Sequence, residues 1–230
     1  MQTISSRYIS GIVVLFLLLT AGISTAANVN VIGRFGGVVD AVAIDGNYAY
    51  IGEGQNFVVL DISAPFNPLE MRSVITPSAI NRITIAGSYA YLTSSSTGLS
   101  IVDISDPAAP ILKGSYDTSG QASDVDVAGN YAYIADSDDG LVIVDITDPT
   151  APSFVTSYYT GNWTEGVDIS GNYAYVTDVV KGLTILDITD PTAPALAGSH
   201  DIGGARDVAV AGNYARSEEH TSELQSPNTI

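Results

Sequence analysis

The sequence repeats itself every 42 residues, and this period constrains the fold more than any other feature. Four aligned segments, which begin at residues 57, 99, 141 and 183, read FVVLDISAPFNP, LSIVDISDPAAP, LVIVDITDPTAP and LTILDITDPTAP. Their shared aspartates, each 42 positions after the last, are Asp61, Asp103, Asp145 and Asp187. Self-similarity of this length is typical of repeat architectures, in which each repeat is one supersecondary unit.

Each unit predicts four short β-strands. In residues 122–159, the alternating segment ASDVDVAG leads through a Gly-Asn turn into NYAYIAD, and GLVIVDI and SFVTSYY follow. Glycine tolerates the positive φ of a two-residue hairpin, and the prolines of DPTAP block strand continuation before the fourth strand. The many β-branched residues argue against a helical repeat of similar length.

The third strand of each unit is apolar on both faces. In one unit Leu141 and Ile143 would share one face, while Val142 and Val144 would share the other. A sheet of this kind must be covered on both sides, which a single unit cannot achieve. Four-stranded sheets stacked face to face around an axis do achieve it. We therefore expect an all-β fold, a β-propeller whose blades are the 42-residue units.

The repeated strings resemble a known family. LVIVDITDP, LSIVDISDP and LTILDITDP, together with the GNYAY hairpin, are similar to the LVIVD repeat of bacterial and archaeal cell-surface proteins. The resemblance covers residues 31–215. It implies a β-propeller-like fold and a prokaryotic cell-surface protein, and it implies no catalytic residue.

Both ends of the repeat region are incomplete. NVIGRFGG (30–37) matches the fourth-strand segment of a unit, so an isolated fourth strand is expected before four full units. The fifth unit has its first strand at 206–212 but breaks off after Ala215, where Arg216 replaces a recurrent Tyr. The segment RSEEHTSELQS that follows resembles a translated sequencing adapter. We therefore expect an incomplete propeller within residues 27–215 and a non-native, disordered tail at 216–230.

The first 26 residues are typical of a signal peptide. Arg7 precedes the apolar run at 11–23, and small residues precede a cleavage site before Ala27. The run is short for a membrane span, although an uncleaved anchor is the alternative. In both cases we expect the remainder to be exported to the periplasm, the cell surface or the medium, with no membrane span after cleavage.

Composition excludes several functions. The net charge of −17 repels phosphate backbones and anionic membranes, so a nucleic-acid partner is not expected. The chain has no cysteine, which excludes disulfides and thiolate catalysis. Metalloprotease, nucleophile-elbow and P-loop motifs are absent from the sequence. We expect a binding module for a protein or a glycan, and the oligomeric state stays open.

Recurrent aspartates have two interpretations. Asp103 and Asp106, and their equivalents in later units, can accept hydrogen bonds from nearby backbone N–H groups in the Pro-containing connector. Oxygen-rich turns can also bind calcium, the only cofactor that the sequence suggests. The turn ADSDDG crowds Asp136, Asp138 and Asp139 and is the candidate metal site, with a solvated acidic turn as the alternative.

Function on a repeat scaffold should lie where the units differ. The residues that enter the first strand of each unit vary, and in a propeller they would ring the mouth of the axial channel. The only Trp of the chain lies beside them and could stack on a sugar or anchor a partner. The candidate binding residues are Asn81, Arg82, Asp124, Trp163, Glu165 and Arg206. The alternative function is a propeller-hosted hydrolase or lyase with a metal or carboxylates at the channel.

Overall fold

The computed structural model describes residues 39–219 and contains only β-strands as regular structure there. Each repeat unit forms one antiparallel sheet, called a blade and numbered along the chain. Blade 1 contains β1 (Ala41–Asp45), β2 (Tyr48–Glu53), β3 (Asn56–Asp61) and β4 (Leu69–Ile75). Blade 2 contains β5 (Arg82–Ala86), β6 (Tyr89–Ser94), β7 (Gly98–Asp103) and β8 (Ile111–Tyr116).

The remaining blades follow the same order. Blade 3 contains β9 (Asp124–Ala128), β10 (Tyr131–Ala135), β11 (Leu141–Asp145) and β12 (Ser153–Tyr158). Blade 4 contains β13 (Thr164–Ser170), β14 (Tyr173–Asp178), β15 (Gly182–Asp187) and β16 (Ala195–His200). Blade 5 contains β17 (Ala205–Ala211) and β18 (Tyr214–Glu219), which pair as a two-stranded sheet. The predicted four-stranded units are therefore confirmed.

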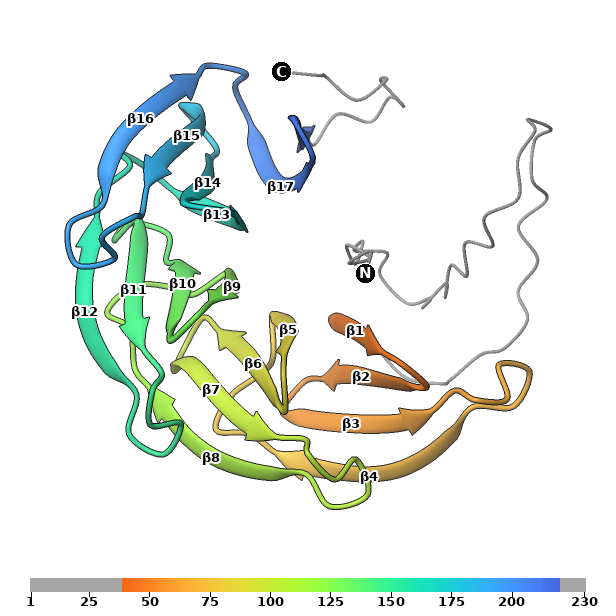
Figure 1. Cartoon of the computed structure of the whole chain (residues 1–230). Coiled ribbons are helices and arrows are strands. Elements are labelled where there is room, and N and C mark those ends of the chain that lie inside the picture. The colour runs from red at the N-terminus through yellow and green to blue at the C-terminus, as the bar shows by residue number, and fades with distance from the viewer. Residues whose placement is uncertain (1–38, 220–230) are drawn as a thin grey trace, which may run out of the picture.

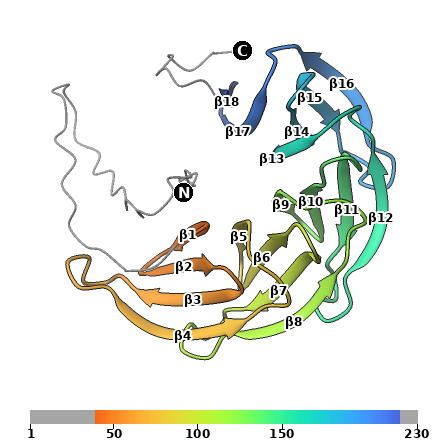
Figure 2. The same cartoon turned by 180° about the vertical axis from the view of Figure 1, so that it is seen from behind.

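The blades stand side by side in an open arc (Figures 1 and 2). The first strand of each blade lies on the inside of the arc, and the fourth strand lies on its outer rim (Figure 1). We call the five inner strands, β1, β5, β9, β13 and β17, the hub. Blades 1 and 5 occupy the two ends of the arc, so the ring is not closed by the described residues (Figure 2). This is the incomplete propeller that the repeat pattern predicts.

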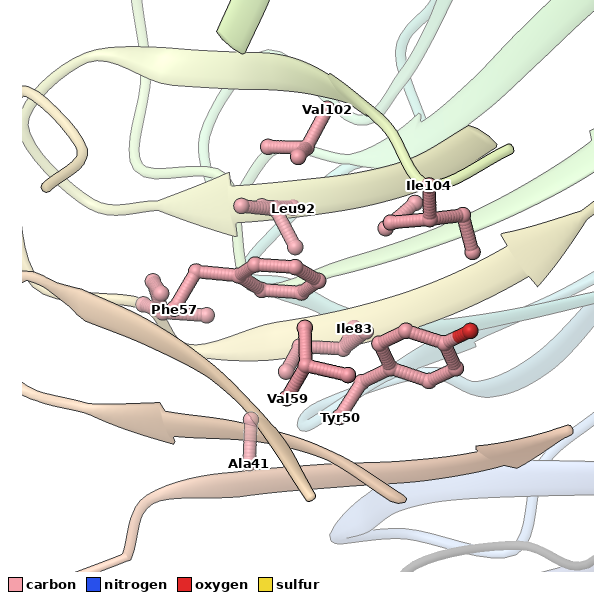
Figure 3. Packing of buried hydrophobic residues seen from close by; sticks show 10 residues of the cluster. Ala41, Tyr50, Phe57, Val59, Ile83, Leu92, Val102 and Ile104 are labelled. Carbon is pink, nitrogen blue, oxygen red and sulfur yellow. The ribbon is translucent and has the colours of Figure 1, made fainter. Parts of the chain in front are cut away.

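Apolar side chains fill the space between neighbouring blades. Tyr50, Phe57 and Val59 of blade 1 point at Leu92 and Val102 of blade 2, and all five are buried (Figure 3). Equivalent clusters join blades 2 and 3, blades 3 and 4, and blades 4 and 5. The two apolar faces of the third strand are thus used as predicted, one toward each neighbouring blade.

Turn chemistry explains the connectors. Asp103 accepts a hydrogen bond from the backbone N–H of Ser105 at 3.0 Å, and Asp106 accepts one from Ala108 at 3.0 Å. The equivalent aspartates of blades 3 and 4 make the same contacts. Each bond stabilises the charged carboxylate, and the pKa of Asp103 falls to about 2, chiefly because of Ser105. The structural interpretation of these recurrent aspartates is confirmed.

The boundary of the predicted tail differs from the structure. Residues 216–219 belong to β18, and Arg216 pairs with Ala209 of β17. Strand pairing uses backbone groups and can continue past the end of a repeat motif, so a disordered tail from 216 is wrong for these four residues. Arg216 is exposed. The Tyr at the same repeat position in blades 1 to 3 is buried in each case: Tyr50, Tyr91 and Tyr133.

Several other predictions lie outside the described residues. They are the signal peptide at 1–26, the isolated fourth strand at 30–37 and the rest of the tail after 219. Among residues 39–219, the structure has no helix with the length and apolarity needed to cross a bilayer.

Candidate functional site

Carboxylates tie the inner strands of the hub together. Asp126 of β9 accepts a hydrogen bond from the backbone N–H of Ile169 in β13 at 2.8 Å. Asp168 of β13 makes the same contact one blade further on, with the N–H of Val210 in β17. Each bond occupies a donor of the next blade's first strand, which has no strand beyond it toward the axis. These aspartates therefore join blades.

Three of the predicted binding residues take part in the same network. Asp124 accepts hydrogen bonds from Arg82 Nε at 3.0 Å and from the N–H of Val167 at 3.1 Å. A second nitrogen of the Arg82 guanidinium lies 3.3 Å from a carboxylate oxygen of Asp207, so one arginine links blades 2, 3 and 5. Asn81 donates to the carbonyl oxygen of Ala122 at 2.9 Å. Asn81, Arg82 and Asp124 thus all contact neighbouring blades.

The hub concentrates negative charge at one place. Burial, together with the smaller effect of the nearby carboxylates Asp168 and Asp124, raises the pKa of Asp126 to about 7 against two backbone hydrogen bonds. Burial also raises the pKa of Asp168, while the hydrogen bond from the Val210 N–H opposes that rise. Both shifts favour the protonated form of the carboxyl in the folded protein.

A second group of candidates lies in the loops that precede the inner strands. Trp163 precedes β13, and its side chain is 49% exposed. Beside it, a guanidinium nitrogen of Arg206 lies 3.1 Å from both carboxylate oxygens of Glu165, which joins β13 to β17. The carbonyl oxygen of Trp163 accepts a hydrogen bond from the N–H of Val179, in the turn between β14 and β15. Trp163 thus lies two residues before Glu165, which pairs with Arg206 of the next blade.

The acidic turn of blade 3 meets this group of loops. Ser137 and Thr164 form an isolated antiparallel bridge, with both N–H to O distances at 3.1 Å. Asp138 directly follows one bridged residue, and Trp163 directly precedes the other. Two features that the sequence places 25 positions apart are thus brought to the same loops, and this convergence was not predicted.

The three aspartates of the acidic turn point to different partners. Asp136 is buried and accepts hydrogen bonds from Thr118 Oγ1 at 2.9 Å and from the N–H of Gly120 at 3.0 Å. Burial is the main reason that the pKa of Asp136 is raised. Asp139 accepts a hydrogen bond from Ser119 Oγ at 2.6 Å, and Asp138 is exposed. In the stretch from 39 to 219, no three acidic or histidine side chains are grouped so that they could hold a metal ion.

The structure adds two residues that sequence reasoning missed. Tyr159 is 66% exposed and lies in the same loop as Trp163, whereas Val180 is 59% exposed and lies in the turn between β14 and β15, which contacts that loop. We call Tyr159, Trp163 and Val180 the aromatic patch. The sequence did contain a signal, because Tyr159 occupies the register of Asp117 and Val180 occupies that of Asp138. An apolar residue in a register that is acidic in the preceding unit marks a place where the units differ.

Stacked four-stranded sheets with their first strands around a common hub define an incomplete β-propeller. The LVIVD repeat family matches the chain five times, at residues 36–76, 79–118, 119–160, 163–201 and 202–215. The chain therefore belongs to the LVIVD repeat family. The last match ends at Ala215, where the sequence pattern also breaks off. No curated protein matches the sequence.

Solved structures of low sequence identity share the fold. A functionally unknown protein from Desulfotomaculum acetoxidans is 12% identical, with a TM-score of 0.70 over 81% of this chain and 64% of that one. The β-propeller domain of Cps50 (Swd1) from Myceliophteria thermophila is 12% identical, with a TM-score of 0.64 over 81% of this chain and 68% of that one. The computationally designed Ika8 protein is 11% identical, with a TM-score of 0.65 over 80% of this chain and 56% of that one. The chain thus spans less than two thirds of the first two structures that it resembles, Ika8 and the Desulfotomaculum protein.

Proposed function

We propose that the protein is an exported β-propeller module that binds a protein or a glycan through the loops around the aromatic patch. The observation that carries this proposal is the exposure of Trp163 and Tyr159 in loops fixed by the Val179 and Ser137 backbone contacts. Exposed aromatic side chains on rigid loops supply large contact area at a low cost in conformational entropy. The remaining polar candidates, Asn81, Arg82 and Asp124, are engaged between blades.

Export is part of the proposal. The first 26 residues have the charge, apolar run and small residues of a signal peptide. We propose that the mature protein acts at the cell surface or in the periplasm, where a binding module would meet its partner. The N-terminal sequence of protein recovered from a secreting host tests this, and a start near Ala27 is expected.

The alternative function is catalysis by carboxylates at the hub. The observation that favours it is the Asp126–Asp168 pair, because a carboxyl with a pKa of about 7 could transfer a proton at neutral pH. However, both oxygens of Asp126 already accept backbone N–H groups, from Val127 and Ile169. This geometry suits the joining of blades better than proton transfer to a substrate, so we favour binding.

Binding to arrays of glycans and of tiled peptides would test the proposal directly. The labelled chain is compared with Trp163→Ala and Tyr159→Ala, which remove the aromatic patch. Phe154→Ala is the matched control, because Phe154 is a similarly exposed aromatic residue on the outer strand β12. Circular dichroism of each variant shows whether it keeps the β-fold.

We expect the chain to bind a small set of spots that Trp163→Ala loses and Phe154→Ala keeps. Loss of an exposed hot-spot aromatic residue costs about 2 kcal/mol or more of binding free energy, which corresponds to roughly thirtyfold in affinity. Binding that is equal in all variants would place the site elsewhere on the molecule. An array with no bound spot would contradict the proposal.

A further inference from the structure

We propose that the partner of the aromatic patch is a basic polypeptide segment, with a Lys or Arg side chain over the Trp163 indole and further cations paired with Asp138 and Asp139. This inference rests on the proposed function and narrows it from two classes of partner to one. A guanidinium or ammonium group is attracted to the face of an indole ring, and more strongly where water is partly excluded. The patch has such a ring, and carboxylates border it.

Carboxylates without a salt bridge lie where the acidic turn of blade 3 meets the Trp163 loop. Asp138 is exposed, follows the residue that bridges to Thr164, and forms no salt bridge with any residue of the described chain. Asp139 is half-buried, and its carboxylate accepts a single hydrogen bond, from the neutral Ser119 hydroxyl. Both carboxylates are therefore available to a cationic ligand.

The cations near the patch already have partners. Lys181 Nζ donates to the carbonyl oxygen of Thr160 at 2.8 Å, and Arg206 is held by Glu165. The local excess of negative charge has the same sign as the net charge of −17. A potential of this sign attracts basic segments and repels acidic ones.

The polar groups beneath the patch are used within the fold, which disfavours a glycan. Thr160 and Thr164 hydrogen-bond to each other through their hydroxyls at 2.6 Å, and both are buried. Asp178 accepts hydrogen bonds from Thr160 and from the N–H groups of Val180 and Lys181. A sugar ring stacked on Trp163 could not use these hydroxyls, whereas a cation would find the Asp138 and Asp139 carboxylates.

The intrinsic fluorescence of Trp163 provides a site-specific assay, because the chain has one Trp. The full chain is titrated with three probes: octa-arginine, octa-glutamate and maltoheptaose. We expect octa-arginine alone to change the emission with saturation, and its apparent Kd to rise several-fold when the salt concentration increases from about 50 to 300 mM. Phe154→Ala should behave as the unaltered chain does.

Charge variants separate a local site from general attraction. In D138N/D139N we expect the apparent Kd for octa-arginine to rise about three- to tenfold, as for the loss of two exposed ion pairs. The control D45N/E70Q removes the same amount of charge from blade 1, where Asp45 and Glu70 are both exposed. We expect the control to bind as the unaltered chain does.

The outcomes distinguish the two proposals. Equal weakening in D138N/D139N and in D45N/E70Q would overturn the inference, because attraction would then come from net charge alone. A fluorescence change with maltoheptaose and none with octa-arginine would also overturn it, while supporting the proposed binding function. No change with any probe, together with blank arrays, would contradict both.

Discussion

At the scale of the residue, the fold raises the pKa of Asp126 in the hub. Its carboxyl accepts two backbone hydrogen bonds, which favour the charged form, yet burial and the neighbouring carboxylates raise its pKa from 3.8 to about 7. The folded protein therefore keeps a proton that the unfolded chain has already released. Such a group stabilises the fold fully below pH 3.8, and this contribution is lost as the pH rises to about 7.

This carboxyl predicts a pH dependence of stability. Between pH 4.5 and 7.5 we expect the Tm to fall, and we expect Asp126→Asn to reduce that fall without abolishing it, because burial also raises the pKa of Asp168. Thermal unfolding followed by circular dichroism at four pH values measures it. Asp103→Asn is the control, since the pKa of Asp103 is lowered to about 2 and its contribution is lost only as the pH falls below 3.8. An unchanged slope in Asp126→Asn would contradict this account of the hub.

At the scale of the element, side chains bond the inner strands β5, β9, β13 and β17 each to the next. Asp168→Ala would leave the N–H of Val210 without its carboxylate partner, so we expect a loss of about 1–3 kcal/mol in the free energy of unfolding. The loss should concentrate in β17, and the amide of Val210 should exchange with deuterium faster. Ser170→Ala, on the same strand, is the control. Unchanged exchange at Val210 in Asp168→Ala would show that the contact does not hold the strand.

The strands could be predicted from sequence, whereas the side-chain hydrogen bonds between blades could not. The alternation of apolar and polar residues within 122–159 defines the faces of four strands, and the same pattern recurs in the other units. Asp126 and Ile169 are 43 positions apart, and their contact depends on the rotation and rise between successive blades, which no repeat pattern states. For this reason the sequence predicted that Asp124 and Arg82 lie at the channel mouth, whereas the structure shows that they form contacts between blades.

The candidate site was predicted in two unconnected parts. The only Trp and the Glu165–Arg206 pair followed from differences between units, and the acidic turn followed from its composition. The bridge between Ser137 and Thr164 brings these parts together, and loop geometry of this kind is set by a few backbone contacts rather than by periodicity. Tyr159 was missed because the sequence placed it in the fourth strand of its unit, whereas the structure ends β12 at Tyr158.

At the scale of the whole molecule, stability is distributed over the junctions between blades. Each cluster of buried residues that joins two blades contains side chains from both blades. At the first junction, for example, Phe57 comes from blade 1 and Leu92 from blade 2. A repeat protein of this kind gains stability from nearest-neighbour interfaces. A single blade would expose both apolar faces of its third strand, including Leu141 and Val142, which are buried here.

Circular dichroism of residues 119–160 alone, compared with residues 79–201, tests the central claim that each sheet is stable only against its neighbours. We predict that the single unit gives no cooperative thermal transition and no near-ultraviolet signal from Tyr133, whereas the longer chain gives both. A cooperative transition with an ordered aromatic signal in the single unit would contradict the claim.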